Sequence, residues 1–256
     1  MGFSDFSLFF AISAIVLSAF VHAAFGFGFP MLATPLLAIQ SNVQNAILFS
    51  LFPTIVVNLI TLLYRRDGGP SVFHFAPLAA YSVIGTLFGT QLLINFSPEP
   101  FRLFLALIIL LYLFKEKLAM HKITWIKEHQ TFSMLIFGLL AGLVSGTTNI
   151  MIPVLLIYLT EIEVERNLMI RVMNLCFFSA KITQVGQFTA AGLLDTTSLI
   201  ISILLSLAAT IAILVGFRFR VYISNNFYDV FLKFSLYIMA FVLIFQFLAS
   251  HLSHTW

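Results

Sequence analysis

Eight apolar runs occupy almost the whole chain and constrain its fold more than any other feature. They lie at 6–39, 43–64, 72–95, 101–118, 132–159, 167–190, 197–217 and 229–250. Hydrophobic residues make up 61% of the 256 positions and charged residues only 9%, whereas about a quarter of a soluble domain is charged. So little charge cannot cover a surface that faces water. The composition excludes soluble enzymes, nucleic-acid-binding modules and disordered chains, and predicts an all-α polytopic membrane protein.

Two of the runs are longer than a single membrane crossing requires. The run at 6–39 has 34 residues and the run at 132–159 has 28, whereas the other six have 18 to 24, the length of one spanning helix. The first run lacks a basic start and a cleavage site followed by polar chain, so we expect it to be retained rather than removed as a signal peptide.

The two long runs resemble each other, which predicts an internal repeat. The matching positions, at a constant offset of 118, are Ala24 with Gly142, Gly28 with Gly146, and Pro35 with Pro153. Three ordinary runs follow each long one, so the simplest account is a duplicated four-element unit. We expect repeat one at 1–118, a cytoplasmic linker at 119–131, and repeat two at 132–256.

The distribution of Lys and Arg predicts the topology, because these residues collect in cytoplasmic loops. If all eight runs crossed once, the loop charges would divide six against five. The two groups would be Arg65, Arg66, Lys115, Lys117, Lys122 and Lys127 against Arg102, Arg166, Arg171, Arg218 and Arg220. If each long run enters and leaves on the same side, the division becomes ten against one. This arrangement puts both termini outside, and it makes repeat two an inverted copy of repeat one. Its cytoplasmic loops lie near 65–71, 115–131, 160–166 and 218–228.

Each long run contains a candidate break near its middle. In the first it is Gly26-Phe27-Gly28-Phe29-Pro30, where glycines relax the backbone and Pro30 suits the first turn of a new helix. In the second it is Ser145-Gly146-Thr147-Thr148-Asn149, with residue types that cap helix N-termini. We expect two broken or re-entrant helix pairs that face each other near the bilayer midplane, and leave open whether each run is re-entrant or a full double crossing.

Broken helices at this depth offer free N–H groups and the positive end of a helix dipole, a combination that attracts anions. The alternative is that the glycines only allow close helix packing, because Gly138, Gly142 and Gly146 form one small-residue ridge and Gly85 and Gly89 another. The Thr147-Thr148-Asn149 cluster favours a binding site, since polar groups in a membrane interior are costly.

The ionisable residues also point to an anion. Every Asp and Glu lies in a loop or at the end of a run, while Lys181 lies deep inside 167–190. A buried ammonium without a carboxylate either loses its proton or binds an anion; the alternative is that Lys181 snorkels. Asn174 and Gln184 share its helix face, with Gln187 one turn further on.

Further polar residues suggest a cavity shared between the halves. Thr54, Asn58 and Thr61 lie in the run at 43–64, and His22 precedes the first break, where it acts either as a hydrogen-bond donor or as a structural residue. The expected substrate-binding residues are His22, Gly26, Phe27, Gly28, Asn58, Gly146, Thr147, Thr148, Asn149, Lys181 and Gln184. We expect no catalytic residue, no metal ligand and no cofactor, and the single cysteine, Cys176, excludes an intrachain disulfide.

Several of these segments together resemble one family. Gly-Phe-Gly-Phe-Pro at 26–30, Met-Leu-Ala-Thr-Pro-Leu-Leu at 31–37 and Tyr-Arg-Arg at 64–66 are similar to the sulfite exporter TauE/SafE family, also called the 4-toluene sulfonate uptake permeases. Both breaks depart from the family's common Gly-Gly-Gly form. The resemblance covers nearly the whole chain and implies export or uptake of sulfur-containing or carboxylated organic anions across a bacterial inner membrane.

The leading hypothesis is therefore a secondary transporter of a small anion such as sulfite or a sulfonate. A passive anion channel remains one alternative. The other is a non-transporting membrane protein, which would be either a membrane assembly partner or an intramembrane enzyme without a recognisable motif. The expected partners are the anion and the bilayer, with no nucleic acid. A homodimer and the coupling ion, proton or sodium, are left open.

Overall fold

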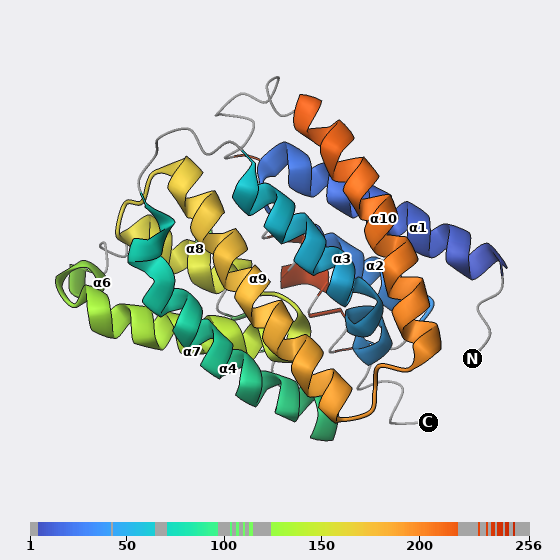
Figure 1. Ribbon diagram of the computed structural model, residues 1–256. Coiled ribbons are helices and arrows are strands. Elements are labelled where there is room, and N and C mark those ends of the chain that lie inside the picture. The colour runs from blue at the N-terminus through green and yellow to red at the C-terminus, as the bar shows by residue number, and fades with distance from the viewer. Residues whose placement is uncertain are drawn as a thin grey trace.

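The computed structural model describes residues 5–41, 43–64, 71–96 and 124–219, with isolated helical positions between 103 and 114 and between 230 and 248. Every regular element in these ranges is helical (Figure 1). The elements are α1 (Asp5–Phe25), α2 (Phe29–Ala38), α3 (Val43–Leu63), η1 (Val72–Phe75), α4 (Ala76–Asn95), α6 (Thr124–Glu128), α7 (Gln130–Thr148), α8 (Ile152–Glu161), α9 (Arg166–Ala190) and α10 (Thr196–Phe219).

Six of the described helices are long and apolar enough to cross a membrane, which confirms the predicted all-α membrane class. The spans are Leu8–Phe25, Gln44–Leu63, Val72–Asn95, Gln130–Thr148, Arg166–Ala190 and Thr196–Phe219. The two remaining apolar helices, α2 and α8, have ten residues each and so reach about 15 Å, half the thickness of a bilayer core. The runs expected at 101–118 and 229–250 lie largely outside the described residues.

The first predicted break is confirmed, and its backbone explains why glycines occupy it. Helix α1 ends at Phe25 and α2 begins at Phe29. Gly26 and Gly28 both have positive φ angles, 86° and 104°, a region that side chains with a Cβ avoid. Pro30 lies in the first turn of α2, where its missing N–H leaves no intrahelical hydrogen bond unmade.

The second break lies later than predicted, so the expected capping role of its polar residues is wrong. Helix α7 continues to Thr148 and α8 begins at Ile152, with Met151 at its N-cap and no side-chain capping bond. The hydroxyl groups of Thr147 and Thr148 donate to the carbonyl of Val144 within α7. Ser and Thr side chains satisfy themselves in this way inside helices, so this cluster prolongs α7 instead of starting α8.

The prolines that the offset of 118 matches lie at different positions in their helices. Pro153 lies in the first turn of α8 and Pro30 in the first turn of α2, whereas Pro35 lies inside α2. The starts of α2 and α8 are 123 positions apart, as are the starts of α3 and α9.

Glycine ridges hold α4 and α7 together, as the packing alternative predicted. A Cβ on Gly142 would overlap the carbonyl oxygen of Ser82, and one on Gly85 would overlap that of Leu139. A Cβ on Gly146 would lie 2.6 Å from the backbone nitrogen of Thr90. Small residues therefore bring these two backbones into contact, and the two helices run side by side along one edge of the molecule (Figure 1).

Buried apolar residues form two main clusters. One joins α1, α2, α3 and α10 around residues such as Ile15, Phe29 and Leu205. The other joins α4, α7, α8 and α9 around residues such as Tyr158 and Met151, and includes the end of α1. Helices α3 and α9 pack against each other between them.

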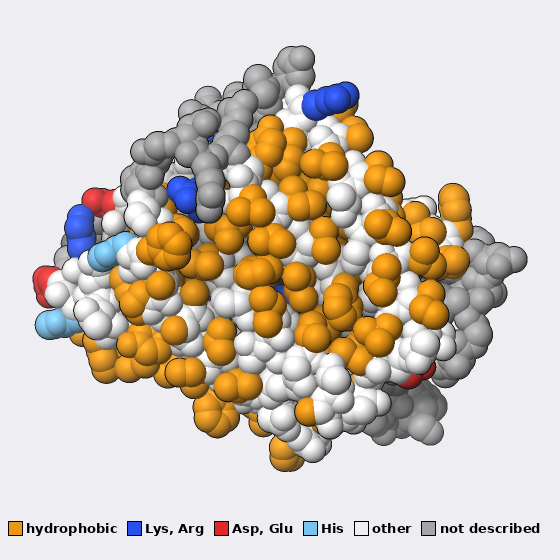
Figure 2. All heavy atoms as spheres, in the orientation of Figure 1, with side chains coloured by type: hydrophobic (Ala, Val, Ile, Leu, Met, Phe, Trp, Pro, Cys, Tyr) orange, Lys and Arg blue, Asp and Glu red, His pale blue; other side chains and the backbone are white. Residues whose placement is uncertain are grey.

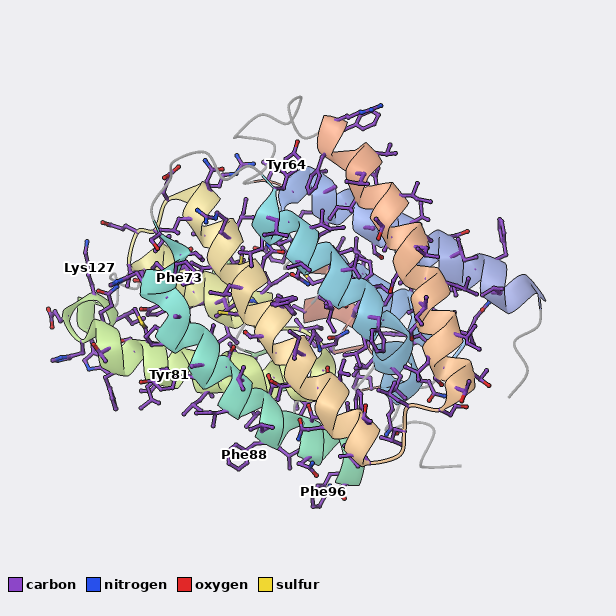
Figure 3. The ribbon with its side chains drawn as sticks, in the orientation of Figure 1. Tyr64, Phe73, Tyr81, Phe88, Phe96 and Lys127 are labelled. Atoms are coloured by element: carbon purple, nitrogen blue, oxygen red, sulfur yellow. The ribbon has the colours of Figure 1, made fainter. Side chains whose placement is uncertain are left out.

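The outer surface suits lipid. In the view of Figure 2 most side chains are hydrophobic, and the charged ones gather at the end where α6 lies and near the end of α10. Phe88 and Phe96 of the α4 region point away from the helices (Figure 3) and are 63% and 66% exposed. Exposed apolar side chains in this number are stable only in an apolar solvent.

One ion pair fixes the relative position of two polar loops. Lys127 Nζ in α6 lies 2.9 Å from Glu163 Oε2, in the turn between α8 and α9. Lys127 is seen at the α6 end of the molecule in Figure 3. The segment near 124–129 and the loop near 162–165 therefore lie on the same side of the molecule.

Candidate functional site

A polar strip on α9 forms the centre of the candidate site. Asn174, Lys181 and Gln184 are all at most 1% exposed, which confirms that they share one buried face. Gln187, predicted to continue this face, is only half-buried and donates to the carbonyl of Leu87 in α4. The strip therefore ends at Gln184.

Asn174 holds the first break. Its Nδ2 donates to the carbonyl oxygen of Gly26 at 2.8 Å and to that of Ile170 at 2.7 Å. The lack of a side chain at Gly26 is also required by space, because a Cβ there would lie 2.7 Å from the side chain of Ile170.

Gln184 and Asn149 hold the second break. Gln184 Nε2 donates to the Gly146 carbonyl at 3.2 Å and to Thr90 Oγ1 at 3.3 Å. Asn149, which has a left-handed backbone with φ 63°, donates through Nδ2 to Thr34 and Ser50. Each break is thus fixed by amide groups whose partners come from distant parts of the chain.

His22 caps the start of α2. The backbone N–H of Phe29 donates to His22 Nδ1 at 3.2 Å, so the proton of the neutral ring lies on Nε2. Nε2 lies 3.1 Å from Thr61 Oγ1, which accepts because its own proton goes to the carbonyl of Val57. The first N–H of α2, expected to be available to an anion, is therefore occupied by the imidazole.

The second break contacts the helix that follows the first one. Asn149 Nδ2 lies 2.6 Å from Thr34 Oγ1 in α2, which begins at Phe29 directly after the first break. The strip on α9 also joins the two regions, because Asn174 donates to Gly26 at the first break and Gln184 donates to Gly146 in the last turn of α7. Lys181 lies between Asn174 and Gln184 along α9.

Lys181 is the electrostatic centre of the strip. Its side chain is completely buried, and its Nζ donates to Gln184 Oε1. Within the described ranges no carboxylate forms an ion pair with it. Removing an ammonium from water costs several kcal/mol unless a counter-charge is supplied. A protonated Lys181 would offer a positive charge and further N–H donors to an anion.

The structure groups some predicted site residues and leaves others apart. All eleven are buried. His22 lies at the first break beside Gly26, Phe27 and Gly28, while Lys181 and Gln184 lie with Gly146. Asn58 donates only to the carbonyl of Thr54 in its own helix, and no hydrogen bond of the described residues joins it to Lys181.

Three hydroxyl residues outside the predicted set also contact the site: Thr34, Ser50 and Thr90. Their residue type was the only signal, and it is ambiguous because Ser and Thr inside apolar helices commonly bond to their own backbone. In the described part of the chain, no group of three or more His, Cys, Asp or Glu side chains lies close enough to hold a metal ion.

Comparison with known proteins gives one match. The profile of a family described as sulfite exporter TauE/SafE matches residues 11–246. No protein of curated function and no solved structure matches the chain.

Proposed function

Because the chain belongs to the sulfite exporter TauE/SafE family, a family of membrane transporters and not of enzymes, we propose that it is a secondary transporter of sulfite, sulfonates or related small anions. The substrate would bind along the α9 strip, between the two helix breaks. Gln184 and the backbone at the breaks would orient it.

One observation carries this proposal: Lys181 is a fully buried lysine without a carboxylate partner among the described residues. An anion would supply the missing charge, and charge-assisted hydrogen bonds of this kind are among the strongest that proteins make. Anion binding therefore explains why a lysine is present at a position where a neutral residue would cost less.

The packing supports the proposed inverted repeat. With an offset of 123, Gly26 pairs with Asn149, both with positive φ, and Asn58 pairs with Lys181. The same offset pairs α1 with α7, α3 with α9 and, approximately, α4 with α10. Under this pairing the contact of α1 with α10 is equivalent to the contact of α4 with α7, and both are extensive.

The two buried clusters suggest which parts move during transport. One unit would be α1, α2, α3 and α10, and the other α7, α8, α9 and α4. Each unit contains one helix from the other repeat. Rocking of the two units about the α3–α9 contact would expose the strip to each side of the membrane in turn.

The ion pair between Lys127 and Glu163 supports the proposed topology. It requires the linker and the 160–166 loop to lie on one side, as they do when each long run enters and leaves on the same side. If every run crossed once, these segments would lie on opposite sides. We place both of them in the cytoplasm and both termini in the periplasm of a bacterial inner membrane.

Flux into proteoliposomes tests the proposed function. A carrier predicts sulfite uptake that saturates with concentration and shows counterflow after preloading. Linear uptake without counterflow would favour a passive anion channel. No flux of any tested sulfur oxyanion or sulfonate would favour a non-transporting assembly partner.

A further inference from the structure

The side-chain amide of Asn149 has an orientation that its neighbours impose. Its Nδ2 lies 2.6 Å from Thr34 Oγ1 and 3.2 Å from Ser50 Oγ. Ser50 gives its own hydroxyl proton to the carbonyl of Ile47, so its oxygen can only accept there. The nitrogen of Asn149 must therefore face Ser50, and Oδ1 must lie on the other side of the amide.

No described residue donates a hydrogen bond to this oxygen. Asn149 is completely buried, and its Oδ1 has no partner among the described residues. Ser145, one turn earlier in α7, is also completely buried, and its Oγ has no partner either. The N–H of Asn149 donates to the Ser145 carbonyl at 3.0 Å, so the two residues occupy the same last turn of α7. Unsatisfied buried oxygens are costly, about 1–3 kcal/mol each.

The chemistry of this turn suits a small cation. It lies at the C-terminal end of α7, where the helix dipole is negative. Unwound carbonyls and half-helix C-terminal ends coordinate coupling ions in transporters with broken helices. Amide and hydroxyl oxygens are not basic enough to bind an additional proton near neutral pH, so a transported proton does not fit this site. The described residues of the site also include no carboxylate, the ligand that divalent cations prefer.

We propose that Asn149 Oδ1 and Ser145 Oγ, with carbonyl oxygens at the end of α7, bind a sodium ion that is cotransported with the anion. The proposal rests on the proposed function, because Gln184 links Lys181 to the Gly146 carbonyl of the same turn. Sodium and the ammonium would repel each other when the site lacks an anion, and an anion between them would remove the repulsion. Sodium and anion would therefore bind cooperatively.

Thermal unfolding of the purified full-length protein tests the site. The melting temperature is measured in sodium, potassium and choline chloride at constant ionic strength, with and without sulfite. Wild type should be stabilised by sodium more than by the other two cations. Sulfite should lower the sodium concentration required for half of the effect.

Ser145→Ala is the decisive variant, because it removes an oxygen that makes no hydrogen bond with the described residues. We expect it to raise the half-saturating sodium concentration at least about fivefold. Ser133→Ala is the matched control: Ser133 lies in the same helix, is equally buried and also has an Oγ without a partner among the described residues, but it is about three turns away from Ser145. It should retain the wild-type response to sodium.

Two results would overturn the sodium site: equal stabilisation by all three cations, or an unchanged sodium response in Ser145→Ala. Neither result would count against the proposed anion transport, provided that sulfite still stabilised the protein. Failure of sulfite to stabilise wild type in every salt would instead count against the proposed function.

Discussion

The side-chain amide of Asn174 donates a 2.8 Å hydrogen bond to the carbonyl oxygen of Gly26, 148 positions earlier in the chain. The bond connects α9 to the broken pair of the other half. Phe25 and Phe27, on either side of Gly26, lie in the same buried cluster as Ile170 and Met173 of α9. Movement of α9 relative to the first break must therefore break this bond.

Asn174→Ala should weaken both stability and transport. Without the amide, the Gly26 carbonyl is buried and unpaired, which costs about 1–3 kcal/mol. Thermal unfolding and sulfite flux measure the two effects. Asn95→Ala is the control, since Asn95 is exposed and donates within its own helix to the Gln91 carbonyl. Equal behaviour of the two variants would show that the bond to Gly26 is unimportant.

Gly28→Ala should reduce transport through the backbone alone. A Cβ at Gly28 meets nothing within 4 Å, but φ is 104°, and such a conformation costs a residue with a side chain about 1–3 kcal/mol. The variant should shift the start of α2 and displace the Phe29 N–H from His22. Gly192→Ala, also in open space with positive φ but between α9 and α10, controls for the strain. Normal flux in Gly28→Ala with correct membrane insertion would contradict this role.

The fold was largely predictable because run length and polar punctuation decide membrane helices directly. Glycines with Pro30 marked the first break correctly, since positive φ and helix initiation are local properties of these residues. The second break was placed too early because the Ser-Gly-Thr-Thr-Asn segment at 145–149 fits a helix N-terminus and a helix C-terminus equally well. Gly146 packs against the backbone of α4 inside α7, a long-range contact that no local pattern encodes.

The site was predictable in part, and for a similar reason. Lys181 and Gln184 were identifiable because charge and amide groups are rare inside apolar runs. The roles of Ser50 and Thr34 depend on contacts with Asn149 from 99 and 115 positions away. No local pattern encodes such contacts.

Asp195 should make stability depend on pH at the N-terminal end of α10. Its Oδ1 accepts from the backbone N–H of Ser198, and hydrogen bonds from the Ser198 side chain and backbone lower the pKa of this carboxyl. A lowered pKa in the folded state adds stability above the unfolded value, about 3.9, and that stability is lost as the pH falls through the folded value.

The melting temperature of Asp195→Ala should therefore be below that of wild type at pH 7, with the difference shrinking in acid. Asp195→Asn keeps an oxygen at the helix start and should show no such pH dependence. A difference between wild type and Asp195→Ala that is constant from pH 7 to pH 3 would rule out the ionised carboxylate as its source.

Cysteine labelling should report opposite sides for two exposed positions. In a Cys176→Ser background, Thr197→Cys should react with an impermeant thiol reagent in intact cells. Glu128→Cys should react only after permeabilisation. Both residues are exposed, so access depends on topology. The reverse pattern would place both termini in the cytoplasm.

Isothermal titration of purified protein with sulfite tests the central claim, that Lys181 binds the transported anion. Lys181→Gln should weaken binding by about 1–3 kcal/mol, or roughly 5- to 150-fold. The variant should still fold, because it removes a buried charge. Lys127→Gln, which removes an exposed lysine, should bind like wild type. Unchanged sulfite affinity in Lys181→Gln would contradict the account.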